Sequence, residues 1–387
     1  MIKYLGSKRT LVPVIGALAA ALPARTAVDL FAGTTRVGQE LRRRGLTVVS
    51  NDVTAFSATF GQAYIVAGED IDRDRLRRLL AGLAALPPVD GYVTETFCRA
   101  SRYFRPGNGM RIDAVRAGID RLELDPVERG LLLTSLLEAA DRFDSTCGVQ
   151  MAYLKQWASR AANPLELREP AAIAGPAGSV SCADANELAA TLAGIDLAYV
   201  DPPYNQHSYL GNYHVWETLV RGDEPEHYGV ACKRADCRTR KSAYNSRREA
   251  GAALDDLLGR LPTPWVVVSL SDEGFHNPGA VEERLSERGH VGVLHVDFKR
   301  YVGAQIGIHN PAGEPVGRVS HMRNTEWILV CGPDRHAVEA AVRSAPPPAV
   351  PRARTDSAPS HATGGTAAPR GGRSAREGTT VTLSPSE

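Results

Sequence analysis

The 387-residue chain lacks the features that mark several classes of protein. Its net charge is only +1, so no overall basic field surrounds it, and any surface that binds nucleic acid must be local. No window approaches the roughly 18 consecutive apolar residues that a membrane helix needs, and no signal-like apolar run opens the sequence. We therefore predict a cytoplasmic protein that has no membrane partner.

A cysteine framework is also missing. The six cysteines, at positions 98, 147, 182, 232, 237 and 331, are scattered, as expected for a reduced protein. His227, Cys232 and Cys237 invite a zinc interpretation, but the sequence offers neither a C-x-x-C pair nor a fourth ligand. We therefore predict no metal site.

What stands out is residues 196–204, Asp-Leu-Ala-Tyr-Val-Asp-Pro-Pro-Tyr. The apolar run predicts a short buried strand, and two prolines, which cannot donate to a sheet ladder, end it. Asp201 and Tyr204 would then lie at the carboxyl end of a strand, where open α/β sheets bind ligands. A proline-rich turn without function is the alternative.

Methyl transfer to an exocyclic amine fits this corner. The lone pair of such an amine is delocalised into the base, and two acceptors for its N–H bonds favour the nucleophilic form. The Asp201 carboxylate and the Pro202 carbonyl would supply them, while Pro203 stiffens the turn. Tyr204 would offer a face on which a flipped base can stack.

Asp-Pro-Pro-Tyr after an apolar strand is a signature of amino-methyltransferases. With this tetrapeptide, the chain resembles the adenine-specific DNA methyltransferases, in the Dam-like alpha group whose cofactor motif comes first. The resemblance reaches about residue 332 and is strongest in 1–9, 27–35 and 196–217. It implies S-adenosylmethionine-dependent methylation of the N6 amine of adenine at a specific site in double-stranded DNA. A cognate restriction endonuclease would be the partner in a restriction-modification system; an orphan enzyme would have none.

Three alternatives remain open at this stage. The substrate could be adenine in RNA or the amino group of cytosine, because related tetrapeptides serve those reactions. A catalytically weak subunit that only recognises DNA is the third. Thr35 suggests this third alternative. It stands where the family has the second glycine of Phe-x-Gly-x-Gly, and its Cβ would keep the backbone from approaching a ligand closely.

The expected cofactor site follows a strand, glycine turn, helix and strand over residues 27–52. Gly33 and Asp52 are 52 − 33 = 19 residues apart, near the roughly 20 of a ribose-binding acid. Asp29 and Phe31 precede the turn. By resemblance, the methionine end would meet Tyr4, Gly6 and Lys8, and the adenine amino group would meet Asp184. A polar helix cap is the alternative for both of these segments.

The fold class we predict is α/β, with a doubly wound, mostly parallel, Rossmann-like sheet. The catalytic domain would comprise 1–68 and 177–335, interrupted by a helical target-recognition insert over 69–176. Residues 336–387 are assigned to a disordered tail, because the composition past about Ser344 has almost no large apolar residues.

Two basic segments are candidates for DNA contacts. In residues 97–105, Arg99, Arg102 and Arg105 alternate with aromatic residues, a mixture that suits phosphates and bases. Residues 232–248 hold seven basic side chains against one acid. From this segment we select Lys233, Arg234, Arg238, Arg240 and Lys241 for phosphate contacts. A solvated charged surface is the alternative for both segments.

Overall fold

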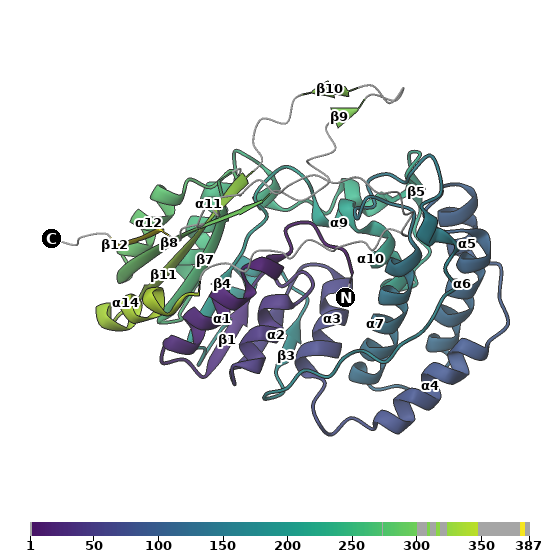
Figure 1. Cartoon of the computed structure of the whole chain (residues 1–387), viewed down its shortest axis with the longest axis horizontal. Coiled ribbons are helices and arrows are strands. Elements are labelled where there is room, and N and C mark those ends of the chain that lie inside the picture. The colour runs from purple at the N-terminus through teal and green to yellow at the C-terminus, as the bar shows by residue number, and fades with distance from the viewer. Residues whose placement is uncertain are drawn as a thin grey trace, which may run out of the picture.

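The computed structural model describes residues 2–272, 274–299, 308–309, 315–317, 323–346 and 380–383. Across these residues one eight-stranded sheet runs through the molecule (Figure 1). Side by side, its strands are β12 (Thr380–Leu383), β8 (His290–Lys299), β11 (Arg323–Gly332), β7 (Trp265–Ser271), β4 (Leu197–Val200), β1 (Thr26–Asp29), β2 (Thr47–Asn51) and β3 (Ser179–Ser181). Two separate pairs are β5 (His227–Tyr228) with β6 (Lys233–Arg234) and β9 (Ile308–His309) with β10 (Pro315–Gly317).

The strand directions define the topology. β1 pairs in parallel with β2 and β4, β2 with β3, and β4 with β7. β11 runs antiparallel to both neighbours, β7 and β8. The chain lays β1, β2 and β3 towards one edge and then returns to add β4 on the other side of β1. This confirms the predicted doubly wound, mostly parallel α/β sheet, and the reversal between β1 and β4 is where such folds bind ligands.

Helices cover both faces of the sheet. All four residues of β4 and six of the seven in β7 are buried, as expected for strands packed on both sides. Their side chains alternate, so that Val267 packs on one face and Val266 and Val268 on the other. The first face is covered by α1 (Val12–Ala21), α2 (Arg36–Arg43) and α14 (Arg335–Ser344), and the second by α8 (Ala185–Ala189), α11 (Ala250–Arg260) and α12 (Pro278–Ser286).

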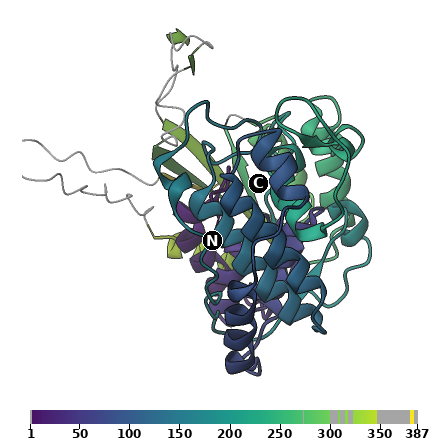
Figure 2. The same ribbon diagram turned by 90° about the vertical axis from the view of Figure 1, so that its right-hand side faces the viewer.

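A body of helices stands beside the sheet, at the end opposite α14 and β12 (Figures 1 and 2). It contains α3 (Ala55–Gly61), α4 (Arg73–Ala85), α5 (Tyr92–Thr94), α6 (Pro106–Asp120), α7 (Pro126–Phe143), α9 (Tyr209–Asn212) and α10 (His214–Arg221). The short helical segments of the chain are η1 (Lys8–Thr10), η2 (Gln62–Val66), η3 (Glu95–Arg99), η4 (Ser159–Ala162), η5 (Ala235–Arg238) and η6 (Ala243–Asn245), of which η2 and η3 pack against this body. Among the described residues no helix combines the length and the apolar character needed to cross a bilayer.

The helical body shares its core with the rest of the chain. Phe56 and Phe60 of α3 and Trp216 of α10 belong to the same buried cluster as Leu132 of α7. The first two helices flank the predicted insert in the sequence, so the insert does not have a separate core. The boundaries 1–68, 69–176 and 177–335 therefore stay a prediction about sequence organisation.

The predicted start of the tail at residue 336 is wrong. Residues 335–344 form α14, whose first turn is capped by Asp334, and Val338, Ala341 and Val342 pack against α1 and β8. Three small apolar residues on one helical face are enough here, although the composition around them looks sparse. Beyond residue 346, the rest of the tail prediction falls on residues outside the described ones, apart from 380–383, whose backbone pairs with β8.

We expect Val342→Ala to lower the free energy of unfolding by about 1–3 kcal/mol, because it removes two buried methyl groups from the α14 interface. Urea denaturation monitored by circular dichroism measures the change. Arg343→Ala, on the exposed side of the same helix, is the control and should stay within about 0.5 kcal/mol. Equal effects of the two substitutions would show that α14 does not pack on the sheet.

Candidate active site

The Asp-Pro-Pro-Tyr corner follows the last residue of β4, Val200, as the sequence predicts. Pro202 is buried, and the carbonyl of Tyr204 accepts a hydrogen bond of 2.8 Å from the backbone N–H of Phe275. Asn245 donates to the carbonyls of Asn205 at 2.7 Å and His207 at 3.2 Å. The corner and the loop behind it are therefore anchored on two sides.

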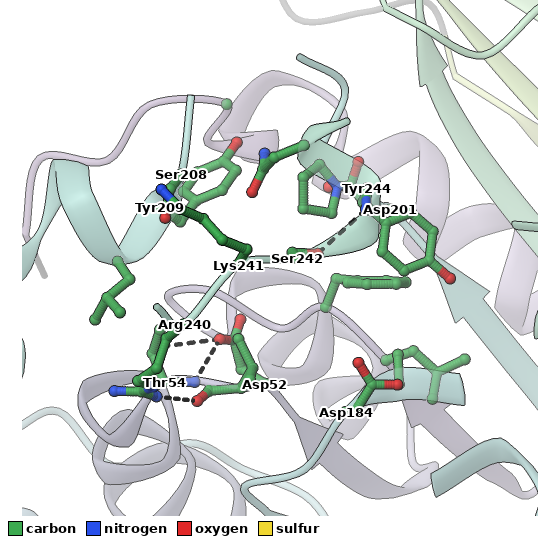
Figure 3. Close-up of a pocket in the computed structure, with 18 of the residues that line it drawn as sticks. Asp52, Thr54, Asp184, Asp201, Ser208, Tyr209, Arg240, Lys241, Ser242 and Tyr244 are labelled. Carbon is green, nitrogen blue, oxygen red and sulfur yellow. Dashed lines mark hydrogen bonds between the residues drawn. The ribbon is translucent and has the colours of Figure 1, made fainter. Parts of the chain in front are cut away.

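A cavity of about 290 Å³ opens beside this corner (Figure 3). Its volume is close to the lower end of the range for small-molecule sites, about 300 Å³. Asp201 borders it together with Asp52 and Asp184, so the structure brings the corner and two of the predicted cofactor acids to one place. The remaining lining residues are Tyr4, Gly6, Leu30, Phe31, Val53, Thr54, Ala183, Ala185, Pro203, Ser208, Tyr209, Leu210, Arg240, Lys241, Ser242, Tyr244 and Asn245. Pro202 and Tyr204 are not among them.

The two acids are held by backbone N–H groups. Asp52, just past β2, accepts hydrogen bonds from the N–H of Gly33 at 2.9 Å and of Thr54 at 3.0 Å. Burial raises the pKa of Asp52, and these hydrogen bonds oppose the rise. Asp184 accepts from the N–H of Asn186 at 2.9 Å and caps α8 while it lines the cavity. The helix cap and the cavity position, which the sequence left as alternatives, are thus both present.

Gly33 and Asp29 lie behind the cavity wall and do not line it. Gly33 has φ +51°, and a Cβ there would lie 2.9 Å from the ring of Tyr4, so the site needs glycine. Asp29 is buried, and one of its carboxylate oxygens accepts the N–H of Gly38 at 3.2 Å. Its other oxygen has no hydrogen-bond partner among the described residues. Burial, followed by the nearby Asp201, raises the pKa of Asp29 to about 8.

Lys8, which the resemblance places at the methionine end of the cofactor, pairs with two carboxylates. It does not line the cavity; its Nζ lies 2.9 Å from Oδ1 of Asp201 and also contacts Oε1 of Glu326. Burial opposes the charge on Lys8, but Asp201 and Glu326 outweigh burial and keep its pKa above the ordinary value. In this structure the ammonium group therefore serves the Asp-Pro-Pro-Tyr corner.

The pKa of the Asp201 carboxyl group lies close to neutral pH. Burial raises its pKa to about 6, with Lys8 opposing the rise and Glu326 adding to it. A carboxylate with this pKa is mostly ionised at pH 7 and can accept hydrogen bonds from an amine. It becomes protonated as the pH falls through about 6.

The backbone conformation at Thr35 is one that glycine adopts more easily. Its φ of 60° and ψ of 17° place it in the left-handed region, which is rare for a β-branched residue. Its hydroxyl donates to the carbonyl of Thr34 at 2.7 Å and accepts from the side chain of Gln39 at 3.0 Å. Thr35 is buried but does not line the cavity, so its Cβ does not narrow the ligand space.

The N-terminal segment is fixed by a stack of tyrosines that the sequence did not reveal. Tyr4 stacks on Tyr213 with ring centroids 4.7 Å apart and on Tyr209 at 5.3 Å. The hydroxyl of Tyr213 accepts the N–H of Leu5. Tyr209 follows Tyr204 by five residues, and this aromatic spacing after the corner was the available signal.

Arg234 contradicts the predicted phosphate contacts. Its side chain is 3% exposed and is held by Asp223 at 2.6 Å and Asp236 at 3.0 Å, so no surface is left for DNA. The isolated basic run could not show this, because one of the two acids lies eleven residues earlier. Arg240 pairs with Glu217 at 3.0 Å and donates to the carbonyl of Val53, and with Lys241 it borders the cavity.

The remaining basic candidates lie nearer the surface. Arg99 forms ion pairs with Asp90 and Glu95. Arg102 and Arg105 lie over the ring of Trp157, at 4.9 Å and 5.5 Å from its centroid. The guanidinium of Arg238 lies 3.9 Å from the ring centre of Tyr228, and Lys233 is half-buried on β6.

His214, in the segment after the corner, is buried away from the cavity. Its Nε2 lies 3.0 Å from the carbonyl of Gln150, and burial lowers its pKa to about 3. A neutral imidazole in that place holds a loop together and is no base for the reaction. Within the part of the chain that the structure describes, no three His, Cys, Asp or Glu side chains are grouped to bind a metal ion.

Comparison with known proteins identifies the class to which this fold and site belong. The family model "D12 class N6 adenine-specific DNA methyltransferase" matches residues 4–258, and the chain belongs to that family. It is therefore an adenine-specific DNA methyltransferase, an enzyme class that in general uses S-adenosylmethionine. The resemblance found in the sequence is confirmed. The family acts on adenine in DNA, which favours this substrate over adenine in RNA and the amino group of cytosine.

The relatives differ in length. The type II methyltransferase M.NlaIII of Neisseria lactamica is 31% identical over 283 residues, which are 70% of this chain and 83% of that protein. The type II methyltransferase M.CviAII of Paramecium bursaria Chlorella virus 1 is 29% identical over 303 residues, 74% and 87% respectively. The modification methylase LlaI of Lactococcus lactis subsp. lactis is 31% identical over 294 residues, which cover 70% of this chain but only 46% of that protein. The chain thus spans less than half of some relatives.

The left-handed conformation of Thr35 generates a prediction about stability. Thr35→Gly and Thr35→Ala both remove the hydroxyl, but only glycine escapes the cost of the left-handed region, about 1–2 kcal/mol. The greater chain entropy of glycine offsets about 0.5–1 kcal/mol of this. We therefore expect Thr35→Gly to be more stable than Thr35→Ala by up to about 1.5 kcal/mol in urea unfolding. A glycine variant less stable than the alanine variant would contradict a left-handed residue 35.

Proposed function

We propose that this chain methylates the N6 amine of an adenine flipped out of double-stranded DNA, using S-adenosylmethionine bound in the cavity. The observation that carries the proposal is that Asp201, at the carboxyl end of β4, borders the same cavity as Asp52 and Asp184. Donor and acceptor sites for the methyl group are thus close together, at the point where the strand order reverses.

The residues around the cavity suit the cofactor. Asp52 would accept the ribose hydroxyls, and Asp184 would accept the adenine amino group, with Leu30, Phe31 and Ala183 beside the ring. Glycine at position 6 lets the backbone lie close to Tyr209, because a Cβ there would be 2.7 Å from the hydroxyl of Tyr209. When bound, S-adenosylmethionine supplies an electrophilic methyl group on a positively charged sulfur.

The corner would prepare the target amine. The ionised carboxylate of Asp201 accepts one N–H of the adenine amine and the carbonyl of Pro202 accepts the other, which concentrates the lone pair on nitrogen. Lys8 holds Asp201 in place through its 2.9 Å ion pair. After the nitrogen gains the methyl group it sheds a proton, and Asp201, with a pKa of about 6, can take that proton and pass it to water.

Stacking of the flipped base is assigned to Tyr204. Its nearest ring carbon lies 3.7 Å from the position that a Cβ on Gly6 would take, so the ring is next to a residue that lines the cavity. Flipping costs a few kcal/mol for unstacking and unpairing, which stacking and the two hydrogen bonds at the corner offset in part.

DNA phosphates would be contacted by the basic residues that remain on the surface. We assign this role to Arg102, Arg105, Lys233, Arg238 and Lys241, and exclude the buried Arg234. The helical insert over 69–176 would read the target site, and the relatives' names as type II methyltransferases and modification methylases support a restriction-modification role with a partner endonuclease.

Asp201→Ala should lower tritiated methyl transfer to plasmid DNA by about 100- to 1,000-fold, the loss typical of removing one group that stabilises the transition state. Binding of S-adenosylmethionine, followed by calorimetry, should change little. Undiminished transfer by the variant, or label on RNA in place of DNA, would contradict the proposal.

Asp52→Ala should weaken the binding of S-adenosylmethionine more than it lowers the rate of methyl transfer. Loss of hydrogen bonds to a carboxylate is worth about 1.5–3 kcal/mol, which corresponds to roughly a 10- to 150-fold higher Kd for S-adenosylmethionine. The maximal transfer rate at saturating cofactor should fall much less. An unchanged Kd would place the ribose away from Asp52.

A further inference from the structure

One buried charge near the corner has no part in the reaction as described so far. Glu326 lies on β11, and its side chain is only 3% exposed. It stands outside residues 4–258, so the match to the family model assigns it no role. Burial of a carboxylate costs several kcal/mol unless partners compensate, and this one therefore needs an explanation.

Glu326 interrupts an apolar row of side chains. Alternate residues of a strand share a face, and on that face Ile328 and Val330 are fully buried in the same cluster as α1. The pattern favours an apolar residue at position 326, yet the chain has a carboxylate there. On the neighbouring strand β7, the hydroxyl of Ser269 donates to Oε1 of Glu326 at 2.7 Å.

The partner that compensates the charge is Lys8. Its Nζ contacts Oε1 of Glu326 and lies 2.9 Å from Oδ1 of Asp201, so one ammonium group serves two carboxylates. The three residues come from η1, from the corner after β4 and from β11, which are far apart in the sequence. All three are largely buried, and water therefore screens their interactions little.

We propose that Glu326 is a positioning residue for methyl transfer: it shares the Lys8 ammonium with Asp201, so that Asp201 keeps its strength as a hydrogen-bond acceptor for the target amine. The inference rests on the proposed function, in which Asp201 accepts that hydrogen bond. It adds a residue, outside the matched family region, that acts on Asp201 through Lys8.

The physical reason is a competition for one positive charge. A carboxylate paired alone with an ammonium group is strongly neutralised, binds protons weakly and accepts further hydrogen bonds weakly. A second carboxylate on the same ammonium reverses part of this effect. In agreement, Glu326 acts to raise the pKa of Asp201 and Lys8 acts to lower it, on top of the rise caused by burial.

Other titratable groups near Asp201 stay uncharged at mildly acid pH. They are Tyr4 before η1, Asp29 on β1, Tyr199 on β4 and Tyr209 on α9. Burial raises the pKa of each of them, and Asp201 adds to each rise; that of Asp29 reaches about 8. The groups whose charges act on the pKa of Asp201 are thus Lys8, which lowers it, and Glu326, which raises it.

The test is the pH dependence of single-turnover methyl transfer to a DNA duplex, measured from about pH 5 to about pH 8 with enzyme in excess, so that product release does not limit the rate. The wild-type rate should fall as the pH drops through about 6, because Asp201 becomes protonated. In Glu326→Gln, the amide can still accept from Lys8 but carries no charge. We expect its acid limb to move to lower pH and its plateau rate to fall, with the Kd for S-adenosylmethionine unchanged.

Two variants sharpen the result. Glu326→Asp keeps the charge but withdraws it from Lys8, and its acid limb should lie between those of wild type and Glu326→Gln; it carries the test if thermal unfolding shows that the glutamine variant does not fold. Asp297→Asn, which removes an exposed carboxylate from the neighbouring strand β8, should leave the limb in place.

The outcomes separate the two proposals. An acid limb that stays in place, or that moves to higher pH, in folded Glu326→Gln or Glu326→Asp would overturn the role of Glu326, because a merely structural residue would change stability without moving the limb. Absence of DNA methylation by the wild-type protein would instead contradict the proposed function.

Discussion

The site depends on one ion pair, between the ammonium of Lys8 and the carboxylate of Asp201, 2.9 Å apart. It joins the N-terminal segment to the corner after β4, and the Glu326 contact extends it to β11. A buried carboxylate without such a partner would take up a proton and lose its capacity as an acceptor. With Lys8 in place, the corner carries a carboxylate that is mostly ionised at pH 7 within an otherwise shielded cavity wall.

The fold places these groups through its strand order. Because β1 and β4 are neighbours but their connections leave in opposite directions, a crevice opens at the ends of the two strands. Asp52 after β2 and Asp184 after β3 reach the same crevice from the parallel strands on one side. The tyrosine stack of Tyr4, Tyr209 and Tyr213 then closes the wall next to the corner.

Much of the sheet and of the candidate site could be predicted from the sequence, since strands, prolines and glycine turns are local signals. The apolar run before Asp201 and the glycine turn before Asp52 located the sheet and the ends of its strands. What the sequence could not show depends on distant partners. Arg234 was predicted to be a basic surface residue but is covered by Asp223, and the ion pair of Lys8 with Glu326 joins segments far apart in the chain. Glu326 itself was detectable as a charge in an apolar row of a strand, although its partner was not.

In the proposed reaction, the Asp201 carboxylate accepts a hydrogen bond from the adenine amine beside the bound cofactor. A crystal structure with an unreactive S-adenosylmethionine analogue and a DNA duplex tests it most directly. We expect the N6 atom of a flipped adenine within about 3.2 Å of an Asp201 carboxylate oxygen, with the analogue between Asp52 and Asp184. An adenine bound elsewhere, or an analogue outside this cavity, would contradict it.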